Sequence, residues 1–273
     1  MRLSLNADLT YDFRHPAETL LLLEAARTPD QTVLSERLTI EGAPAPVRID
    51  DPETGERRVV FTGHGRVRIV YTAEVEVSRE ASDIRGLSAA PVRELPSDAL
   101  KYLRASRYCL SDRMERFVRR EFRALEAGDK VDAILRWIAD HVDYEAGVSD
   151  STSTALDTFA DRAGVCRDFT HLAISFLRAA DIPARAVSAF AWRLDPPDMH
   201  AVVEVFLGGA WRLIDPTGKA PVEGLVRVAT GLDAADIAFM TVFGEAQLVM
   251  QGFEVSRCDV AVESRTLEPA TAG

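Results

Sequence analysis

The segment that decides the fold reads Gly164-Val165-Cys166-Arg167-Asp168-Phe169-Thr170-His171-Leu172. From Cys166 onward its apolar residues recur at helical spacing, and Asp181-Ile182-Pro183 ends the pattern. The first turn of a helix presents unpaired N–H groups and the positive end of the helix dipole, which together favour an anion. The sequence therefore predicts a helix that begins at Cys166 and favours the thiolate form of its side chain.

A simpler interpretation is that Cys166 is a small buried apolar residue, as cysteines often are. Its chemical interpretation depends on a partner further along the chain. His200 opens the alternating segment 200–207, and Gly208-Gly209 then leads into the segment 210–214, which Asp215 follows. These residues predict a β-hairpin with a two-residue turn.

The register of that hairpin brings an acid beside a base. A turn at Gly208-Gly209 pairs Leu207 with Ala210, so Val202 lies opposite Asp215. His200 lies two residues before Val202 on the same face, at a diagonal distance of about 7–8 Å from the carboxylate. Individually, His200 could be a satisfied strand histidine and Asp215 a turn residue. Together with Cys166 they predict a catalytic triad of nucleophile, base and orienting acid.

The other histidines are weaker candidates. His171 projects about 140° around the helix axis from Cys166, which predicts a core or supporting position. His141 is expected to cap the carboxyl end of a helix, and His15 and His64 lie in expected turns. The chain has no zinc-ligand spacing, nucleotide-binding glycine loop or EF-hand pattern, so we expect no metal and no cofactor.

The amino-terminal segment, from Arg2 to about Arg79, alternates apolar and polar side chains at period two, with turn residues at Asp50–Gly55 and at Gly63-His64-Gly65. It predicts an antiparallel β-sandwich. An irregular stretch around 82–96 precedes residues at helical spacing, which predict helices over about 114–125, 131–142 and 166–180. Strands are expected after Pro183, at Ala184–Trp192, His200–Leu207, Ala210–Ile214 and Gln247–Val262. We therefore expect an α+β protein with a β-sandwich domain at 1–95 and a catalytic domain at 96–273. The strands expected in the first domain are Arg2–Tyr11, Leu20–Ala26, Val33–Glu41, Pro46–Ile49, Arg57–Thr62 and Arg66–Val77.

Composition narrows the possible partners and the compartment. The chain has 273 residues, with 43 acidic against 32 basic side chains and a net charge of −11, which argues against broad binding of nucleic acid. Its three cysteines are an odd number at wide spacing, which favours a reducing compartment. No apolar run approaches the roughly 20 residues of a spanning helix, and the amino terminus lacks a secretory pattern. We expect a cytoplasmic protein without a membrane partner, and the oligomeric state stays open.

Several of these segments resemble the bacterial transglutaminase-like superfamily. The resemblance runs from about Asp129 to Phe243, and the amino-terminal segment resembles more weakly the β-rich region that precedes this core. The matching motifs are Gly164–Leu172, Ile182-Pro183-Ala184-Arg185, His200-Ala201 and Trp211-Arg212-Leu213-Ile214-Asp215-Pro216-Thr217. One departure is Val202, where the family often has tryptophan.

The resemblance implies a papain-like core in which Cys166 is the nucleophile, His200 the general base and acid, and Asp215 the orienting residue. Such a pair attacks carboxamide or peptide bonds and leaves a thioester on the cysteine. With water as acceptor the enzyme is a peptidase or amidase, and with a primary amine it is an acyltransferase. The expected substrate is a protein or peptide. The Cys166 N–H is expected to meet the oxyanion, and Tyr144 is a candidate second donor.

One alternative from another class remains. The same fold could serve as a catalytically inactive binding or scaffolding protein, although all three candidate residues are present. In either case we expect the amino-terminal domain to position substrate without supplying a catalytic group. A core that begins near Leu100 is then expected to fold by itself.

Overall fold

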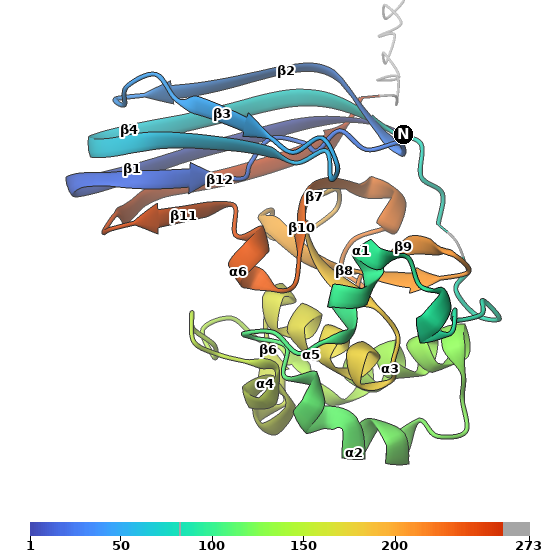
Figure 1. The fold of residues 1–273 in the computed structure, drawn as a ribbon. Coiled ribbons are helices and arrows are strands. Elements are labelled where there is room, and N and C mark those ends of the chain that lie inside the picture. The colour runs from blue at the N-terminus through green and yellow to red at the C-terminus, as the bar shows by residue number, and fades with distance from the viewer. Residues whose placement is uncertain (82, 259–273) are drawn as a thin grey trace, which may run out of the picture.

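The computed structural model describes residues 1–81 and 83–258 and shows an α+β fold of two antiparallel sheets, a short two-stranded parallel sheet and helices (Figure 1). Six strands form one sheet, which we call the sheet lobe. Residues 97–239 hold the helices and the four-stranded sheet, and we call this part the core lobe. The predicted α+β class is confirmed. Within the described part of the chain, no helix is both long and apolar enough to cross a membrane.

The sheet lobe has the strand order β11-β1-β4-β2, with β12 beside β1 and β3 beside β4. Alternate residues of the two longest strands are buried, as period-two alternation requires. Its strands are β1 (Arg2–Leu21), β2 (Gln31–Glu41), β3 (Val47–Asp50), β4 (Arg57–Val77), β11 (Met240–Phe243) and β12 (Gln247–Arg257).

The amino-terminal strands do not form a two-sheet sandwich by themselves. They form one sheet, and part of the core lobe, including β7 (Ala184–Ala191) and β10 (Leu225–Gly231), packs on its buried face. Tyr71 of β4, for example, lies 6.1 Å from Phe190 of β7 between ring centroids. The second layer that the buried face requires therefore comes from later in the chain.

The segment Gly63-His64-Gly65 is not a turn, which corrects the expectation of separate strands on either side of it. It lies inside β4, where Gly63 pairs with Ala17 and Gly65 with Phe13, so the register shifts between them. A side chain at Gly63 would lie 2.6 Å from the Phe13 ring, and Gly65 has a φ of +67°. These glycines permit a bulge and a close approach, which sequence alone does not separate from a turn.

The sheet lobe takes strands from distant parts of the chain. Strands β11 and β12 both pair with β1, although they are the last two strands of the described chain and β1 is the first. The proposed division between residues 95 and 96 stays a prediction. Two strands on the carboxyl side of this division, β11 and β12, complete the amino-terminal sheet. Residues 259–262 of the predicted strand Gln247–Val262 lie outside the described residues.

The core lobe contains a four-stranded sheet in the order β10-β7-β8-β9, and the predicted helices and strands 184–214 are confirmed within a few residues. Sequence reasoning missed α4, which has only seven residues, and β10, where a register shift at Arg227 and Ala229 breaks the alternation. The remaining elements are α1 (Ser97–Leu100), α2 (Ser111–Glu121), α3 (Ala127–His141), β5 (Asp143–Tyr144), α4 (Ala155–Asp161), β6 (Ala163–Gly164), α5 (Cys166–Ala179), β8 (Met199–Leu207), β9 (Ala210–Ile214) and α6 (Ala234–Ile237), with 3-10 turns at Val92–Glu94, Lys101–Leu103 and Val222–Gly224.

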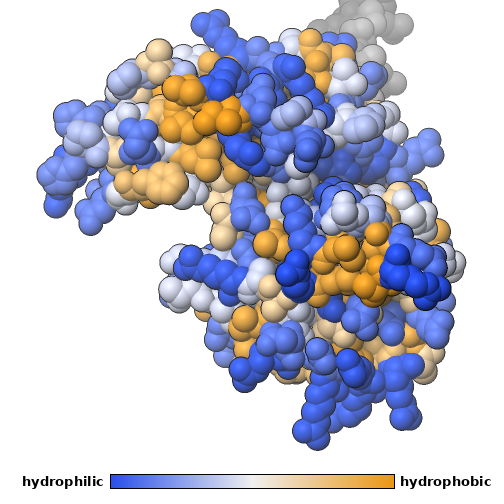
Figure 2. All heavy atoms as spheres, viewed as in Figure 1, coloured by the Kyte–Doolittle hydropathy of each residue, from blue (hydrophilic) through white to orange (hydrophobic). Residues whose placement is uncertain are grey.

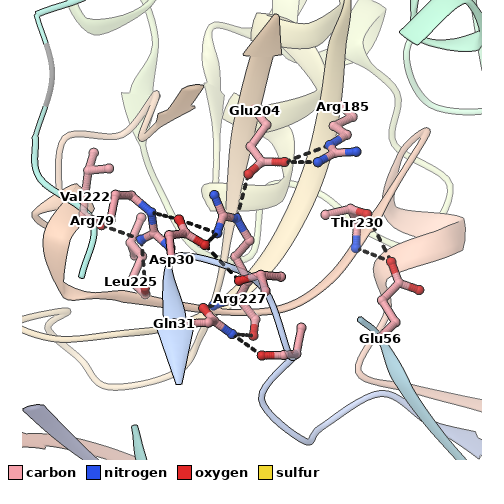
Figure 3. Close-up of polar contacts among 12 residues, drawn as sticks. Asp30, Gln31, Glu56, Arg79, Arg185, Glu204, Val222, Leu225, Arg227 and Thr230 are labelled. Carbon is pink, nitrogen blue, oxygen red and sulfur yellow. Dashed lines mark hydrogen bonds and ion pairs between the residues drawn. The ribbon is translucent and has the colours of Figure 1, made fainter. Parts of the chain in front are cut away.

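A buried ionic network joins the two lobes (Figure 3). Arg227 of β10 pairs with Asp30, which precedes β2, at 2.5 Å and with Glu204 of β8 at 2.6 Å. Arg79 also pairs with Asp30, and Arg185 with Glu204. Because each buried charge has an opposite charge in contact, the network fixes the amino-terminal segment onto the core sheet without leaving a bare ion.

The space-filling view shows an indentation between the two lobes at the left (Figure 2). Hydrophobic side chains also gather on the sheet lobe in this view. Helix α6 lies beneath β11 on this same side (Figure 1), and the backbone N–H of Leu22 donates to the Phe239 carbonyl between them. The lobes therefore meet closely at α6.

Candidate active site

Cys166 is the first residue of α5, as predicted, and it is half-buried. The residues just before it set this helix start. The Asp168 carboxylate accepts a hydrogen bond from the Val165 N–H at 2.9 Å, a capping arrangement at the first turn. A side chain at Gly164 would lie 2.6 Å from Asp168 Cβ, so glycine is required at this point. The cap leaves Cys166 at the positive end of the helix.

Asp168 is itself held by two neighbours. It is buried, and it accepts hydrogen bonds from Ser149 and from the Arg167 guanidinium, the latter at 3.0 Å. Arg167 also donates to Ser149 at 3.2 Å. This closed group fixes the turn that presents the thiol, since a buried carboxylate needs its hydrogen-bond partners to remain in place.

The hairpin register is the predicted one. Leu207 pairs with Ala210 and Val203 with Ile214, so β9 leads Asp215 toward the start of β8. There His200 Nε2 lies 3.0 Å from Asp215 Oδ2, and both side chains are almost completely buried. The structure therefore brings the predicted base and the predicted acid into direct contact.

Asp215 is oriented by groups that follow it in the chain. Its Oδ1 accepts hydrogen bonds from the Thr217 backbone N–H at 2.9 Å and from the Thr217 hydroxyl at 2.8 Å. Its Oδ2 accepts one from the Ala220 N–H at 3.0 Å. Burial opposes the charge, but the hydrogen bonds and the charge of His200 outweigh it and lower the pKa of Asp215. The carboxylate is thus ionised and fixed in orientation.

His200 contacts both other members of the predicted triad. Burial would lower its pKa, but the hydrogen bonds and charge interactions with Asp215 and Cys166 raise the pKa of His200 to about 9. Nε2 is occupied by Asp215, and Nδ1 has no hydrogen-bond partner among the described residues, so Nδ1 is the ring atom left to exchange a proton with the thiol. The imidazole therefore stands between carboxylate and thiol, the arrangement of an acid–base pair with a nucleophile.

Tyr144, the candidate second oxyanion donor, also lies at Cys166. Its hydroxyl is within hydrogen-bonding reach of both the backbone N–H and the thiol of Cys166. Burial and the nearby Cys166 raise the pKa of Tyr144 to about 12, so the phenol keeps its proton near neutral pH. The Lys219 ammonium lies 4.2 Å from the centre of the Tyr144 ring. These contacts place a phenolic donor beside the Cys166 sulfur.

The remaining histidines lie outside this group. His171 is buried, stacks on Tyr108 at 5.1 Å between ring centroids, and accepts a hydrogen bond from the Ala234 N–H. Burial lowers its pKa to about 4, which keeps the ring neutral. His141 Nδ1 lies 2.8 Å from the Trp137 carbonyl at the end of α3, so its predicted capping position is confirmed. Val202, the departure from the family pattern, is completely buried in a small apolar cluster.

Cys166 and His200 line a cleft of about 480 Å³. Its other walls include α6, the residues before β8, β11 and β12. Among them Asp198 accepts a hydrogen bond from the Gln251 side chain at 2.9 Å, and burial raises the pKa of Asp198. Sequence reasoning missed both residues, because the pairing of β12 with β1 is what brings Gln251 near Asp198 and the start of β8. No three or more His, Cys, Asp and Glu side chains of residues 1–81 and 83–258 gather as a metal site.

Comparison with known proteins places these residues in a family. The model of the transglutaminase-like superfamily matches residues 115–216, a span that holds Cys166, His200 and Asp215. A crystal structure from Cytophaga hutchinsonii, named "putative cysteine protease", is 35% identical with a TM-score of 0.89. The match covers 96% of this chain and 92% of that one.

A curated relative is also similar over a shorter region. The Mycobacterium leprae (strain TN) protein named "uncharacterized protein ML0607" is 32% identical over 115 residues, which are 39% of this chain and 41% of that protein. The match therefore spans less than half the length of that relative. The Cytophaga hutchinsonii protein, in contrast, is similar along almost the whole of both chains. On the strength of that likeness and of the family model across the site, the chain belongs to the transglutaminase-like superfamily.

Proposed function

We propose that the protein is a cysteine enzyme that acts on carboxamide or peptide bonds through a thioester on Cys166. The observation that carries this proposal is the position of His200, in contact with Asp215 on one side and with Cys166 at the start of α5 on the other. The family supports the general kind of function, that of a transglutaminase-like cysteine enzyme. The reaction and the three catalytic roles are our inference.

In the first half of the reaction, the Cys166 thiolate attacks the carbonyl carbon of the substrate. The C–N bond breaks, the protonated imidazole of His200 gives its proton to the leaving amine, and a thioester forms. The oxyanion of the intermediate is met by the Cys166 N–H and by the Tyr144 hydroxyl, which lies at the same sulfur. Asp215 holds the imidazole in the orientation that this transfer needs.

In the second half, neutral His200 takes a proton from the acceptor, which attacks the thioester and releases the Cys166 thiolate. Water as acceptor gives hydrolysis, and a primary amine gives a new amide. We expect hydrolysis or limited acyl transfer, since the Cytophaga hutchinsonii relative carries the name of a protease. The proposal includes a reducing compartment such as the cytoplasm, because Cys109, Cys166 and Cys258 are all free thiols.

The test incubates the protein with peptides from a cell extract, with and without an added primary amine such as methylamine, and analyses the products by mass spectrometry. Cleaved or deamidated peptides indicate water as acceptor, and methylamine adducts indicate an amine. Cys166→Ala serves as the control. Products that are the same with Cys166→Ala as with the unaltered protein would contradict the proposal and favour the binding or scaffolding alternative.

A further inference from the structure

A groove of the sheet lobe lies where β11 ends and β12 begins. It has a volume of about 810 Å³, and both apolar and charged residues line it. The lining residues used below are Tyr11, Met240, Val242, Gly244, Glu245 and Gln247. This combination suits a polypeptide better than a purely apolar molecule, because a polypeptide offers apolar side chains and backbone hydrogen-bonding groups together.

The groove coincides with a gap in strand pairing. On this side of β1, residues 3–12 pair with β12 and residues 18–21 pair with β11. Between these two ladders, β1 residues 13–17 have no strand partner on this side within the described chain. Gly244 fills one end of the gap, since a side chain there would lie 2.8 Å from Ala17 Cβ. The three-residue linker 244–246 joins β11 to β12 across this gap, so the groove lies on the face of the sheet beside the gap and not at a free strand edge.

The groove continues into the cleft of Cys166. Met240 lines both, and Gln251 of β12 lines the cleft itself. Met240 pairs with Leu21 and Gln251 pairs with Leu9, and both of these β1 residues are buried on the face toward the core lobe. Because directly paired residues point to the same face, Met240 and Gln251 project toward the core lobe as well. The groove and the cleft therefore open on one side of the sheet.

We propose that this groove binds the polypeptide chain of the substrate, in extended form, while its carboxamide lies at Cys166. Apolar side chains of the substrate contact Tyr11, Met240 and Val242. Its backbone N–H groups donate to the polar side chains of Glu245 and Gln247 on the groove wall. The inference rests on the proposed function and deepens it. It assigns the sheet lobe to substrate binding, and it explains why strands from distant parts of the chain meet beside the cleft.

The experiment measures alkylation of Cys166 by iodoacetamide and by hexapeptides of alternating leucine and serine. Three peptides are used, and each carries one iodoacetyl group. The group is attached to the amino end in the first peptide, to a lysine side chain in the middle of the second, and to a lysine side chain at the carboxyl end of the third. The reacting carbon is the same in all of these reagents. The rate constant of a peptide divided by that of iodoacetamide therefore reports binding of the peptide chain alone. Peptide mapping separates Cys166 from Cys258, which is exposed, and Cys109, which is buried.

Two substitutions block the groove. Val242→Trp fills it from a half-buried position, and its matched control is Val33→Trp, a half-buried valine on the opposite edge strand β2. Glu245→Trp alters an exposed wall residue, where the core cannot be disrupted, and its matched control is Glu41→Trp on β2. Circular dichroism checks that each variant folds. Iodoacetamide, which needs no groove, should alkylate Cys166 at the same rate in all of them.

We expect at least one peptide to react about tenfold faster than iodoacetamide with the unaltered protein, and both groove variants to remove most of this advantage while both controls keep it. If the rate constant of every peptide were close to that of iodoacetamide, the proposal that the groove binds the substrate would be wrong. The same would follow if Val242→Trp and Glu245→Trp left the peptide advantage unchanged. Failure of the proposed function looks different. Cys166 would then react with iodoacetamide no faster than Cys258, while a peptide advantage that the groove variants remove would still support the groove.

Discussion

At the residue scale, the site is a contact of three side chains, and we expect its members to act as a unit. Cys166→Ala removes the proposed nucleophile, and His200→Ala removes a group that contacts both Cys166 and Asp215. Each change should abolish turnover with the fold retained, and the double variant should lose no more than either single one. Product formation by mass spectrometry, with circular dichroism as control, measures this. Near-normal activity in either single variant would exclude the cysteine mechanism.

We expect Asp215 to set the pH range of the proposed reaction. Burial opposes the charge of His200, but contacts with Asp215 and Cys166 raise the pKa of His200 to about 9. The stability that the charged imidazolium contributes is therefore fully present below the ordinary pKa of histidine, and it is lost as the pH rises through about 9. Cys166-dependent activity should fall along the same alkaline limb. Asp215→Asn removes a charge that raises this pKa, so the limb should move toward neutral pH. At neutral pH the rate should fall by less than the roughly 10²–10⁴-fold loss of a general base.

The pH profile of the two proteins, measured with one substrate, tests this prediction. An alkaline limb at the same pH in both would show that the contact between His200 and Asp215 has no kinetic role. Thr217→Val is a useful companion, because it removes a donor to Asp215 while the carboxylate charge remains. The alkaline limb of the Thr217→Val pH profile should move toward neutral pH by less than that of Asp215→Asn.

At the element scale, the start of α5 sets the position of the thiol. Asp168→Ala removes the cap at Val165 and leaves Arg167 without its carboxylate partner. We expect a loss of about 0.5–2 kcal/mol in the free energy of unfolding from the cap, and slower alkylation of Cys166. Urea unfolding and iodoacetamide kinetics measure the two effects. As a control, Asp157→Ala removes the equivalent cap of α4, and it should lower stability without slowing Cys166.

Sequence patterns predicted elements whose signals are local. The hairpin register follows from Gly208-Gly209, which sets both strands of the turn, and the start of α5 follows from Gly164 and the apolar spacing after it. The gap in pairing along β1 could not be predicted, because it depends on where β11 and β12 join a strand that is distant from them in the sequence. For the same reason, the positions of Asp198 and Gln251 in the cleft became visible only in three dimensions.

At the scale of the whole molecule, buried charges hold the two lobes together. Arg227→Met would leave Asp30 and Glu204 without a shared partner, and we expect a loss of about 3–5 kcal/mol in the free energy of unfolding. The matched control is Arg68→Met, which breaks a surface pair with Asp8 and should cost about 0–1 kcal/mol. Equal losses in urea unfolding would show that the network contributes no more than a surface contact.

The lobes also depend on each other through shared strands. Sequence periodicity predicts a core beginning near Leu100 that folds by itself, but removal of residues before 96 would delete β1 and leave β11 and β12 without their partner. It would also expose Phe190 and Phe253, which pack together at the lobe interface. We therefore expect this fragment to aggregate or to lose structure. A monomeric fragment with native circular dichroism and reactive Cys166 would contradict that expectation.

The central claim, that His200 activates Cys166, is tested most directly by alkylation with iodoacetamide across a pH series. Peptide mapping follows Cys166, with exposed Cys258 as an internal standard. We predict that Cys166 reacts at mildly acidic pH, where Cys258 does not, and that His200→Ala removes this difference. Reactivity of Cys166 no greater than that of Cys258 at every pH, or an advantage that persists in His200→Ala, would contradict the account.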